Sequence, residues 1–413
     1  MQTHAHPLGG PLFTRAYLFL LGIGAIGIAL TIWRFAAGLG ASTGLNDGYP
    51  LGIWIALDVV TGTALACGGY AVALVVYIFN KGHYHPLVRP AILTSALGYT
   101  IAGTSVAIDL GRPWNMWKIP LYFWNWNLNS SLLEVALCIM AYVFVLWIEL
   151  SPAFMEKWSV DGPPRLKRIS QRILPILDKA LIWIIALGML LPTMHQSSLG
   201  SLMMLAGPKL HPLWLTGWLP LFFLVTCLAM GYAVVVFESV FSSIVFGRKP
   251  ELVMLRNLQK IAAWGGLFFV IIRIVDLAFS GNLHYATTLD LYGTMFWIEN
   301  LLWLLPLAML AGPRANLGGL FRGAMVVALA GAVYRFDTYL VAFNPGPGWH
   351  YFPSVPEMFI SFGLIAIELA IYVAVVKRFP IVAASARPTA LVGKASATIS
   401  AHTNSIGILG EKP

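Results

Sequence analysis

Charge is the scarcest property of this sequence: only 10% of its 413 residues are Asp, Glu, Lys or Arg, whereas 58% are hydrophobic. Water-soluble domains carry about 25% charged residues. A soluble globular fold is therefore excluded, because so few polar side chains cannot cover so large an apolar interior. The chain must instead be surrounded largely by lipid.

Cysteine is also scarce. Cys67, Cys138 and Cys227 each stand alone within an apolar segment and form no CxxC pair. An iron–sulfur cluster or a structural zinc ion needs clustered thiolates, so we expect no Fe–S cluster and no metal site in this chain. The nine histidines fall at the ends of apolar segments, in loops or in tails. A haem between membrane helices needs facing histidines inside the hydrocarbon, so the sequence also predicts no haem.

What the sequence has in abundance is long apolar segments. Windows of about 20 apolar residues, long enough to cross a hydrocarbon core of roughly 30 Å, recur along its whole length. The predicted fold is all-α and integral to the membrane, and its first apolar segment is interpreted as a retained anchor. The ten predicted transmembrane helices cover about 16–36, 52–79, 88–110, 129–150, 175–193, 213–246, 260–280, 291–312, 319–343 and 356–378.

Lys and Arg are distributed unequally over the loops. With ten spans both termini lie on one side, and that side holds twenty basic residues against four on the other. The positive-inside rule places both termini in the cytoplasm. The net charge of +9 therefore reflects topology, and it indicates no nucleic-acid partner. Residues 1–15 form a cytoplasmic N-terminus, and residues 379–413, rich in Ala, Ser, Thr and Gly, are predicted to be a disordered cytoplasmic tail.

Two loops on the less basic side are rich in aromatic residues. The segment 111–130 carries four tryptophans, and 344–356 combines Pro, Gly and aromatic side chains. Trp and Tyr prefer the lipid–water interface, which accounts for such residues without any partner. A surface dense in Trp and Asn also suits the docking of another protein. The sequence alone leaves both interpretations open.

Several ionisable residues fall inside the predicted spans, where each costs about 2.5–3.5 kcal/mol and therefore needs a reason. One group of polar residues lies at a similar depth near the outer ends of four consecutive spans. Each member alone could form an interhelical hydrogen bond. Together they predict a polar pocket near the outer leaflet, with Ser197 and Ser198 as additional donors. The members are Asp58, Asp109, Arg112, Glu134, His195 and Gln196.

Two acids of the fourth predicted span indicate a proton pathway. Glu134 and Glu149 lie on one helical stripe, roughly 22 Å apart, near the outer and inner ends of the span. Tyr99, at mid-depth in the third span, offers a hydroxyl between them. Carboxylate, phenol and water at such spacing can pass protons across a membrane. Alternatively, Glu149 is merely an interfacial residue.

The second half of the chain is predicted to use its charges mainly for structure. Arg273 and Asp276 are three residues apart on one helix, a spacing that allows a local ion pair. Pairs between helices are expected among Glu299, Arg335, Asp337 and Glu368.

Several long strings of the sequence resemble one family of membrane proteins. They include CGGYA at 67–71, VYIFNKGHYHPLVRPA at 76–91 and LPTMHQSSLGSLM at 191–203. These strings resemble the NrfD/PsrC-type quinone-interacting membrane subunits, and within that family the membrane subunits of periplasm-facing nickel–iron uptake hydrogenases. The resemblance covers nearly all of residues 8–378 and fails only in the tail.

This resemblance implies ten helices arranged as two four-helix bundles, at about 52–193 and 213–343, flanked by the first and last helices. It implies a bacterial inner-membrane protein with a menaquinone or ubiquinone site in the first bundle near the periplasmic face. Implied partners are a periplasmic Fe–S ferredoxin-like subunit and the small and large subunits of a nickel–iron hydrogenase. By position, the residues that fall where the family places quinone or proton chemistry are Asp58, Tyr99, Asp109, Glu134 and His195.

The expected function is quinone reduction with electrons from the Fe–S partner. His195 is expected to donate to a quinone carbonyl, because an imidazole titrates near neutral pH. Protons drawn along Glu149, Tyr99 and Glu134 would couple the reaction to a gradient. The alternatives are service to another periplasmic oxidoreductase of the polysulfide or nitrite reductase type, a haem-binding cytochrome, and a proton-coupled transporter. A transporter is disfavoured, since broken helices meeting near the midplane are not evident.

Overall fold

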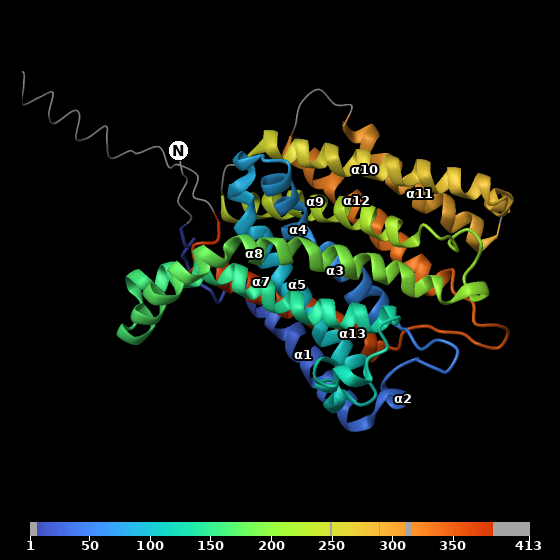
Figure 1. Ribbon diagram of the computed structural model, residues 1–413, viewed down its shortest axis with the longest axis horizontal. Coiled ribbons are helices and arrows are strands. Elements are labelled where there is room, and N and C mark those ends of the chain that lie inside the picture. Colours follow the sequence, from blue (N-terminus) through green and yellow to red (C-terminus); the bar gives the residue numbers. More distant parts are fainter. Residues whose placement is uncertain (1–5, 248–249, 289, 311–315, 383–413) are drawn as a thin grey trace, which may run out of the picture.

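The computed structural model describes residues 6–247, 250–288, 290–310 and 316–382, and every regular element within these ranges is helical (Figure 1). Ten spans are long and apolar enough to cross a membrane, which confirms the predicted number for the described residues. The predicted disordered tail lies outside the described residues from 383 onward. The spans are α1 (Arg15–Ala37), the composite span Trp54–Ile78, Gly82–Asp109 with α5 (Val88–Asp109), α7 (Ser131–Asp161), α8 (Pro164–Met204), α9 (Leu219–Phe246), α10 (Leu252–Phe279), α11 (Leu291–Leu310), Leu317–Val341 with α12 (Leu317–Phe336), and α13 (Val355–Arg378).

Two of these helices are much longer than the apolar windows predict. α7 and α8 contain 31 and 41 residues. At 1.5 Å per residue they measure about 46 and 62 Å, against roughly 30 Å for a hydrocarbon core. The predicted windows 129–150 and 175–193 are too short, because apolar content marks the lipid-facing part of a helix and not its ends. The two helices must therefore extend beyond the bilayer.

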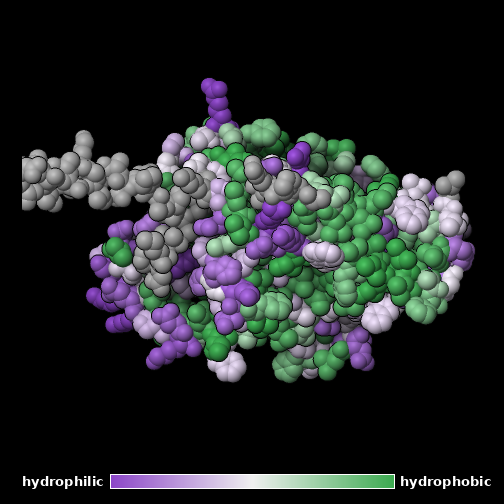
Figure 2. All heavy atoms as spheres, turned by 90° about the horizontal axis from the view of Figure 1, so that it is seen from above, coloured by the Kyte–Doolittle hydropathy of each residue, from purple (hydrophilic) through white to green (hydrophobic). Residues whose placement is uncertain are grey.

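The long helices run roughly side by side along the longest axis of the molecule (Figure 1). In that view α9, α10, α11 and α12 occupy the upper part, α5, α7 and α8 the middle, and α1 and α13 the lower edge. Apolar side chains cover much of the face seen in Figure 2, whereas hydrophilic side chains are concentrated on its left part, with smaller groups near the centre and at the right edge. This distribution fits a body whose flank contacts lipid.

The second span is the most buried one and departs from a regular α-helix. It begins as a π-helix (η1, Trp54–Thr61), continues as α3 (Gly62–Leu65) and α4 (Gly68–Ala73), and ends in another π-helical stretch (η2, Leu74–Ile78). A further π-helical stretch, η8 (Asp337–Val341), extends α12. π-Helical turns are rare and often occur at functional sites, which directs attention to the side chains of this span.

Glycines allow neighbouring helices to approach the second span closely. A Cβ on Gly69 would lie 2.9 Å from Ser95 Oγ of α5, and one on Gly231 of α9 would lie 2.8 Å from the carbonyl oxygen of Cys67. Gly69 uses this proximity, since its amide donates to Ser95 Oγ at 2.9 Å. Packing through small residues is the usual way for helices to associate in membranes. The second span thereby contacts helices of both halves of the chain.

The first and last spans form a pair at the lower edge. A Cβ on Gly27 of α1 would lie 2.7 Å from Gly363 Cα of α13, so the two backbones touch at their crossing. The start of α13 is fixed by a capping box, in which Ser354 Oγ accepts from the Glu357 amide and Glu357 Oε2 accepts from the Ser354 amide. α13 also packs on α5, which brings its side chains to the second span.

At the end of the molecule opposite the start of α1, three loops are joined by hydrogen bonds. The Tyr49 hydroxyl donates to the Phe343 carbonyl at 3.1 Å, and Asn344 N donates to the Lys209 carbonyl at 2.7 Å. The Tyr351 hydroxyl donates to Glu357 Oε1 at 2.9 Å, and burial raises the pKa of Tyr351. These contacts hold the ends of the two halves together around the mouth of the second span.

Candidate functional site: a buried polar chain around Tyr99 and His195

His195 lies inside a helix and not at its end. The polar sequence PTMHQSSLGS continues α8, which ends nine residues after His195, at Met204. The serines do not end the helix, because Ser197 and Ser198 each donate a hydroxyl hydrogen to the Met194 carbonyl, at 2.7 and 2.9 Å. The predicted position of His195 and Gln196 at the end of a span is therefore wrong. His195 lies roughly 13 Å from the end of α8.

A chain of buried hydrogen bonds surrounds His195. The Tyr99 hydroxyl lies 3.3 Å from His195 Nε2 and 3.2 Å from Cys67 Sγ. On the other side, Gln196 Nε2 lies 3.0 Å from His195 Nε2 and donates to Thr63 Oγ1 at 2.9 Å. All five side chains are inaccessible from the surface. This group, from here on the Tyr99–His195 chain, joins the second, third and fifth spans.

The links between Cys67, Tyr99 and His195 pair groups that can exchange donor and acceptor roles, whereas Gln196 Nε2 is an amide nitrogen and can only donate. A phenol, an imidazole and a hydroxyl can each give or take a hydrogen bond. Gln196 Oε1, in contrast, is buried and has no hydrogen-bond partner among the described residues. A buried acceptor without a partner is uncommon and needs an explanation such as a bound molecule. Gln196 Oε1 is therefore an unpaired acceptor within the Tyr99–His195 chain.

Aromatic packing fixes the position of Tyr99. Its ring meets that of Tyr142 edge-on, with ring centres 4.5 Å apart, and that of His195 at 5.3 Å. The Tyr70 hydroxyl forms a separate hydrogen bond of 2.7 Å with Thr193 Oγ1, two residues before His195 on α8. With the rings held from several sides, the hydroxyl of Tyr99 has little freedom to leave His195.

Asp58 belongs to a second polar group on the same span. Its Oδ2 accepts from Ser105 Oγ of α5 at 3.2 Å and from Ser361 Oγ of α13 at 2.8 Å. Glu368, two turns after Ser361 on α13, faces Gly98 of α5, where a Cβ would lie 3.3 Å from Glu368 Oε1. Asp58 is thus a buried acid at a junction of three helices, five residues before Thr63.

The other predicted members of the pocket lie apart from the Tyr99–His195 chain. Arg112 is exposed in the loop after α5. Asp109, at the end of α5, interacts electrostatically with Arg34 of α1, whose Nη2 donates to the Leu110 carbonyl at 2.6 Å. Asp109 Oδ1 is buried and has no hydrogen-bond partner among the described residues.

The two glutamates of α7 differ in their surroundings. Glu134 lies in the first turn of α7 and is partly exposed. Glu149 packs against α8, since a Cβ on Gly188 would lie 3.3 Å from Glu149 Oε2. α7 continues for twelve residues beyond Glu149 to Asp161, so Glu149 is not at the end of its helix, and its place at the inner end of the membrane span stays a prediction. Tyr142 lies two helical turns before Glu149 on the same stripe, and its ring packs edge-on against that of Tyr99.

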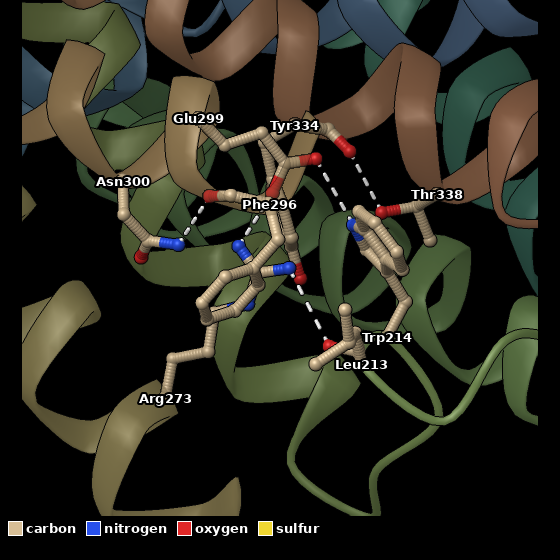
Figure 3. Close-up of polar contacts among 8 residues, drawn as sticks. All are labelled: Leu213, Trp214, Arg273, Phe296, Glu299, Asn300, Tyr334 and Thr338. Carbon is tan, nitrogen blue, oxygen red and sulfur yellow. Dashed lines mark hydrogen bonds and ion pairs between the residues drawn. The ribbon is translucent and has the colours of Figure 1, made fainter. Parts of the chain in front are cut away.

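Arg273 forms an ion pair with Glu299 and not with Asp276, the predicted partner. Its Nη1 lies 2.5 Å from Glu299 Oε2, and both side chains are almost inaccessible. The other oxygen of Glu299 accepts from Trp214 Nε1 at 3.0 Å (Figure 3). The aromatic ring of Phe296 lies 4.6 Å from the guanidinium. The predicted pair with Asp276 is wrong, because Arg273 points into the interior whereas Asp276 is only partly buried.

Arg335 is completely buried but pairs with no carboxylate among the described residues. Its Nη2 donates to the Phe223 carbonyl at 2.7 Å and its Nη1 to the Val60 carbonyl at 3.4 Å. The predicted ion pair of Arg335 is therefore wrong, because carbonyls of α9 and of the π-helix η1 accept from its two terminal nitrogens instead. The same two bonds connect α12 to both halves of the chain.

The described histidines do not fit a haem held between helices. Such a haem needs two imidazoles that face each other inside the membrane. His195 is deep within a span, contrary to the expectation for all nine histidines, but its Nε2 already contacts Tyr99 and Gln196. The other described histidines lie in loops or in the first turn of a span. The described residues also contain no group of three or more metal-ligating side chains.

Several residues of these polar groups escaped the sequence reasoning. Cys67, Thr63 and Ser105 look like ordinary small residues of membrane helices, and no pattern marks them as partners of Tyr99, Gln196 or Asp58. Ser361 lies 303 residues from Asp58, so its contribution is a matter of tertiary packing alone. One signal was available: Ser361 and Glu368 are seven residues apart, which places them on one face of the last span.

The chain was compared with known proteins. Residues 41–344 match the family described as "Polysulphide reductase, NrfD". The chain is 42% identical over 393 residues to the "Probable Ni/Fe-hydrogenase 2 b-type cytochrome subunit" of Escherichia coli, with 92% of this chain and 96% of the relative covered. It is 33% identical over 372 residues to a protein of Nitratidesulfovibrio vulgaris, with 86% and 91% covered.

A shorter similarity connects the chain to a quinone enzyme. The "Menaquinone reductase, integral membrane subunit" of Nitratidesulfovibrio vulgaris is 30% identical over 170 residues, which is 40% of this chain and 38% of the relative. The family match covers most of the chain, including the second, third and fifth spans that carry the Tyr99–His195 chain. Together with the ten apolar spans, these similarities show that the chain is a multi-pass membrane protein of the NrfD family.

Proposed function

We propose that this chain is the quinone-reducing membrane subunit of a periplasmic nickel–iron hydrogenase complex in the bacterial inner membrane. The hydrogenase assignment is supported by the name of the Escherichia coli relative, which covers almost the whole chain. Menaquinone is favoured over ubiquinone by the name of the menaquinone reductase subunit, whose similarity covers 40% of this chain. The observation that carries the proposal is the Tyr99–His195 chain, with its free acceptor at Gln196 Oε1.

Reduction of a quinone to a quinol consumes two electrons and two protons. The electrons would come from a docked Fe–S ferredoxin-like subunit, since this chain's described residues offer no cluster or haem ligands. The protons require donors beside the quinone oxygens. Tyr99 and His195 are suitable because each can donate one proton and recover it from a hydrogen-bonded neighbour. Gln196 Oε1 would accept the hydroxyl hydrogen of the quinol and so distinguish product from substrate.

A proton route to this site would begin at Glu149. Its carboxylate lies against Gly188 of α8, and Tyr142 stands between it and Tyr99 on the interior face of α7. Such a succession of carboxylate and phenols can relay protons with the help of water. This route differs from the sequence expectation in its middle, where Tyr142 takes a place beside Tyr99. Glu134 and Asp58 would serve the outer end of the same relay.

The partner subunit would dock on the aromatic loop 111–130. Trp114, Trp117 and Trp124 are 68, 51 and 64% exposed, and Phe123 is 65% exposed. Exposed Trp clusters are typical hot spots of protein interfaces. Inward transfer of electrons from a docked subunit requires a short path, and this loop begins directly after α5, which carries Tyr99.

A second candidate is the same role in a different periplasmic oxidoreductase of the polysulfide or nitrite reductase type. The family description favours it, because it names a polysulphide reductase. Affinity purification in a mild detergent separates the two candidates through the identity of the subunits that accompany the chain. A nickel–iron large subunit supports the hydrogenase, whereas a molybdopterin or multihaem subunit supports the other assignment.

The quinone role is tested by substitution within the purified complex. We expect Tyr99→Phe to lower hydrogen-dependent reduction of a soluble menaquinone analogue by about 10²–10⁴-fold, the range of general acid–base contributions. His195→Ala should abolish it. Tyr70→Phe is the matched control, because it removes a buried hydroxyl whose hydrogen-bond partner among the described residues is Thr193. Reduction of an artificial dye by the catalytic subunits should be unchanged in all variants. Full quinone turnover by both Tyr99→Phe and His195→Ala would refute the proposal.

A further inference from the structure

The ends of α7 and α8 form a helical hairpin that projects beyond the other helices at the end where the chain begins (Figure 1). We call residues 152–179 the hairpin tip. Pro152 lies inside α7 and Pro175 inside α8. Proline within a helix removes a hydrogen bond and bends the axis. In Figure 1 the tip is turned away from the direction of the long helices, which is the orientation that two facing kinks produce.

The base of the hairpin is anchored to the body of the protein. Arg89, at the start of α5, contacts Glu156 of α7 with both guanidinium nitrogens, at 2.8 and 2.5 Å. The ring of Phe379, just after α13, packs edge-on against Phe154 and Trp158. These contacts fix where the hairpin leaves the bundle. The angle of the tip is therefore held by the fold and does not depend on an outside partner.

The α8 arm of the tip is amphipathic in an unusual way, because its apolar stripe faces outward. Leu166, Ile169, Ile173 and Ile176 follow one another at spacings of three, four and three residues, which places them on one helical face. Leu166, Ile169 and Ile176 are 36, 48 and 63% exposed. No other described element covers this stripe, although α7 packs along the inner side of the arm. An exposed apolar stripe outside the lipid-spanning body needs a partner.

Basic residues border this apolar stripe. Arg165, Arg168 and Arg172 are spaced like the stripe and lie beside it, and Lys167 lies on its other side. With Lys179 included, the segment 161–179 contains five basic and two acidic residues. All five are exposed, and none forms an ion pair with a described residue. The tip thus offers unpaired positive charge on both flanks of an apolar strip.

We propose that the hairpin tip lies on the surface of the membrane that the protein spans, with the stripe of Leu166, Ile169 and Ile176 between lipid chains and the bordering arginines bound to anionic phospholipid headgroups. An apolar stripe bordered by Lys and Arg is the pattern of interfacial helices. Anionic lipid attracts such residues over short distances. The tip then acts as an anchor that holds the bundle at a fixed depth and tilt.

Charge and geometry favour lipid over a protein partner. An acidic protein would satisfy the arginines but would leave no reason for an outward apolar stripe that begins directly where α8 leaves the bilayer. The membrane surface is always within reach, since the α8 arm from Pro164 to Lys179 is only about 24 Å long and is continuous with the spanning part of α8. Trp183, 74% exposed one turn after Lys179, is typical of the lipid interface at that level.

The proposal is tested with the full chain in lipid nanodiscs, one set of phosphatidylcholine and one of equal parts phosphatidylcholine and phosphatidylglycerol. An environment-sensitive fluorophore is attached to Ile169→Cys, because the described native cysteines are all buried. We expect a blue-shifted emission in the anionic discs and quenching by a lipid-linked quencher. The same dye on Gln171→Cys, on the opposite side of the helix, should report water in both sets.

Charge is tested on the Ile169→Cys background. Replacing Arg165, Arg168 and Arg172 with Gln should remove the shift in anionic discs. A matched control replaces Arg15, Lys81 and Lys260 with Gln, which lowers the charge equally outside the tip and should keep the shift. Emission that reports water in both lipids would overturn the proposal and leave an acidic protein as the candidate occupant. An equal shift in both lipids would also contradict it, since headgroup charge would then be irrelevant.

Discussion

At the scale of single residues, this protein deals with buried charge in two ways. Arg273 and Glu299 neutralise each other and are each satisfied by further contacts, with Trp214 on one carboxylate oxygen. Arg335 instead uses backbone carbonyls and leaves its charge uncompensated by any carboxylate among the described residues. Charges deep in a membrane protein are costly, so we expect both arrangements to have a structural role. The first ties three elements of the second half together, and the second ties the halves to each other.

We predict that Arg273→Leu destabilises the protein strongly. It leaves Glu299 buried with its charge unpaired, and breaking a buried pair in this way typically costs about 3–5 kcal/mol. The loss is measured as the drop in the thermal midpoint of the detergent-solubilised protein. Arg89→Leu is the control, since the Arg89–Glu156 pair is partly exposed and such pairs contribute about 0–1 kcal/mol. Equal midpoints for the two variants would contradict the interpretation.

The same residues show what sequence reasoning can and cannot reach at this scale. Arg273 and Glu299 were both recognised as expensive and as structural, because hydropathy exposes any ion within a span. Their pairing was missed because a helix allows an i,i+3 partner, while tertiary packing places Glu299 closer. The functional role of His195, inferred from its residue type, stays a prediction, but its expected place at the end of a helix was wrong. In the sequence the serines after His195 suggest a helix end, but serine hydroxyls can bond within their own helix and do not mark its end.

At the scale of elements, close crossings of small residues set the distances between spans. The crossing of α1 and α13 at Gly27 and Gly363 brings backbone against backbone. This contact matters beyond the pair, because α13 carries Ser361, which donates to Asp58. A helix that sequence patterns place at the periphery thus supports a polar group of the second span. Such a role follows from packing and could not be read from an isolated apolar window.

We predict that Gly27→Leu separates α1 from α13 and lowers both stability and quinone turnover. The new side chain would meet Gly363 Cα, which cannot move aside as a flexible side chain could. Because the same shift would withdraw Ser361 from Asp58, the loss of turnover should match that of Ser361→Ala. Gly22→Leu is the matched control, since a Cβ at Gly22 meets nothing within 4 Å. The measurements are the thermal midpoint and quinone reduction by the complex. A thermal midpoint and quinone turnover of Gly27→Leu equal to those of the wild type would contradict the prediction, because the crossing would then have room for a larger side chain.

At the scale of the whole molecule, the number of spans was predictable and their lengths were not. Composition determines that the chain lies in lipid, and windows of hydropathy count its crossings. The extra length of α7 and α8 lies in mixed polar sequence such as RLKRISQRI, which hydropathy assigns to a loop. Helices continue there because the two arms pack on each other. Orientation rests on the distribution of Lys and Arg, an independent kind of information that the fold itself does not contain.

The orientation is testable with two single substitutions in otherwise intact cells. Asn125→Cys lies in the exposed aromatic loop 111–130, and Gln171→Cys lies on the exposed side of the hairpin tip. If the basic side faces the cytoplasm, a membrane-impermeant thiol reagent added to spheroplasts should label the first and leave the second unlabelled. Permeabilised cells should give labelling of both, which is the control for reactivity. The described native cysteines are buried and contribute little background. Labelling of Gln171→Cys alone in spheroplasts would show that the topology is the reverse of the predicted one, and the electron donor would then dock on the other side. The expected pattern instead places loop 111–130 where a periplasmic Fe–S subunit can reach it.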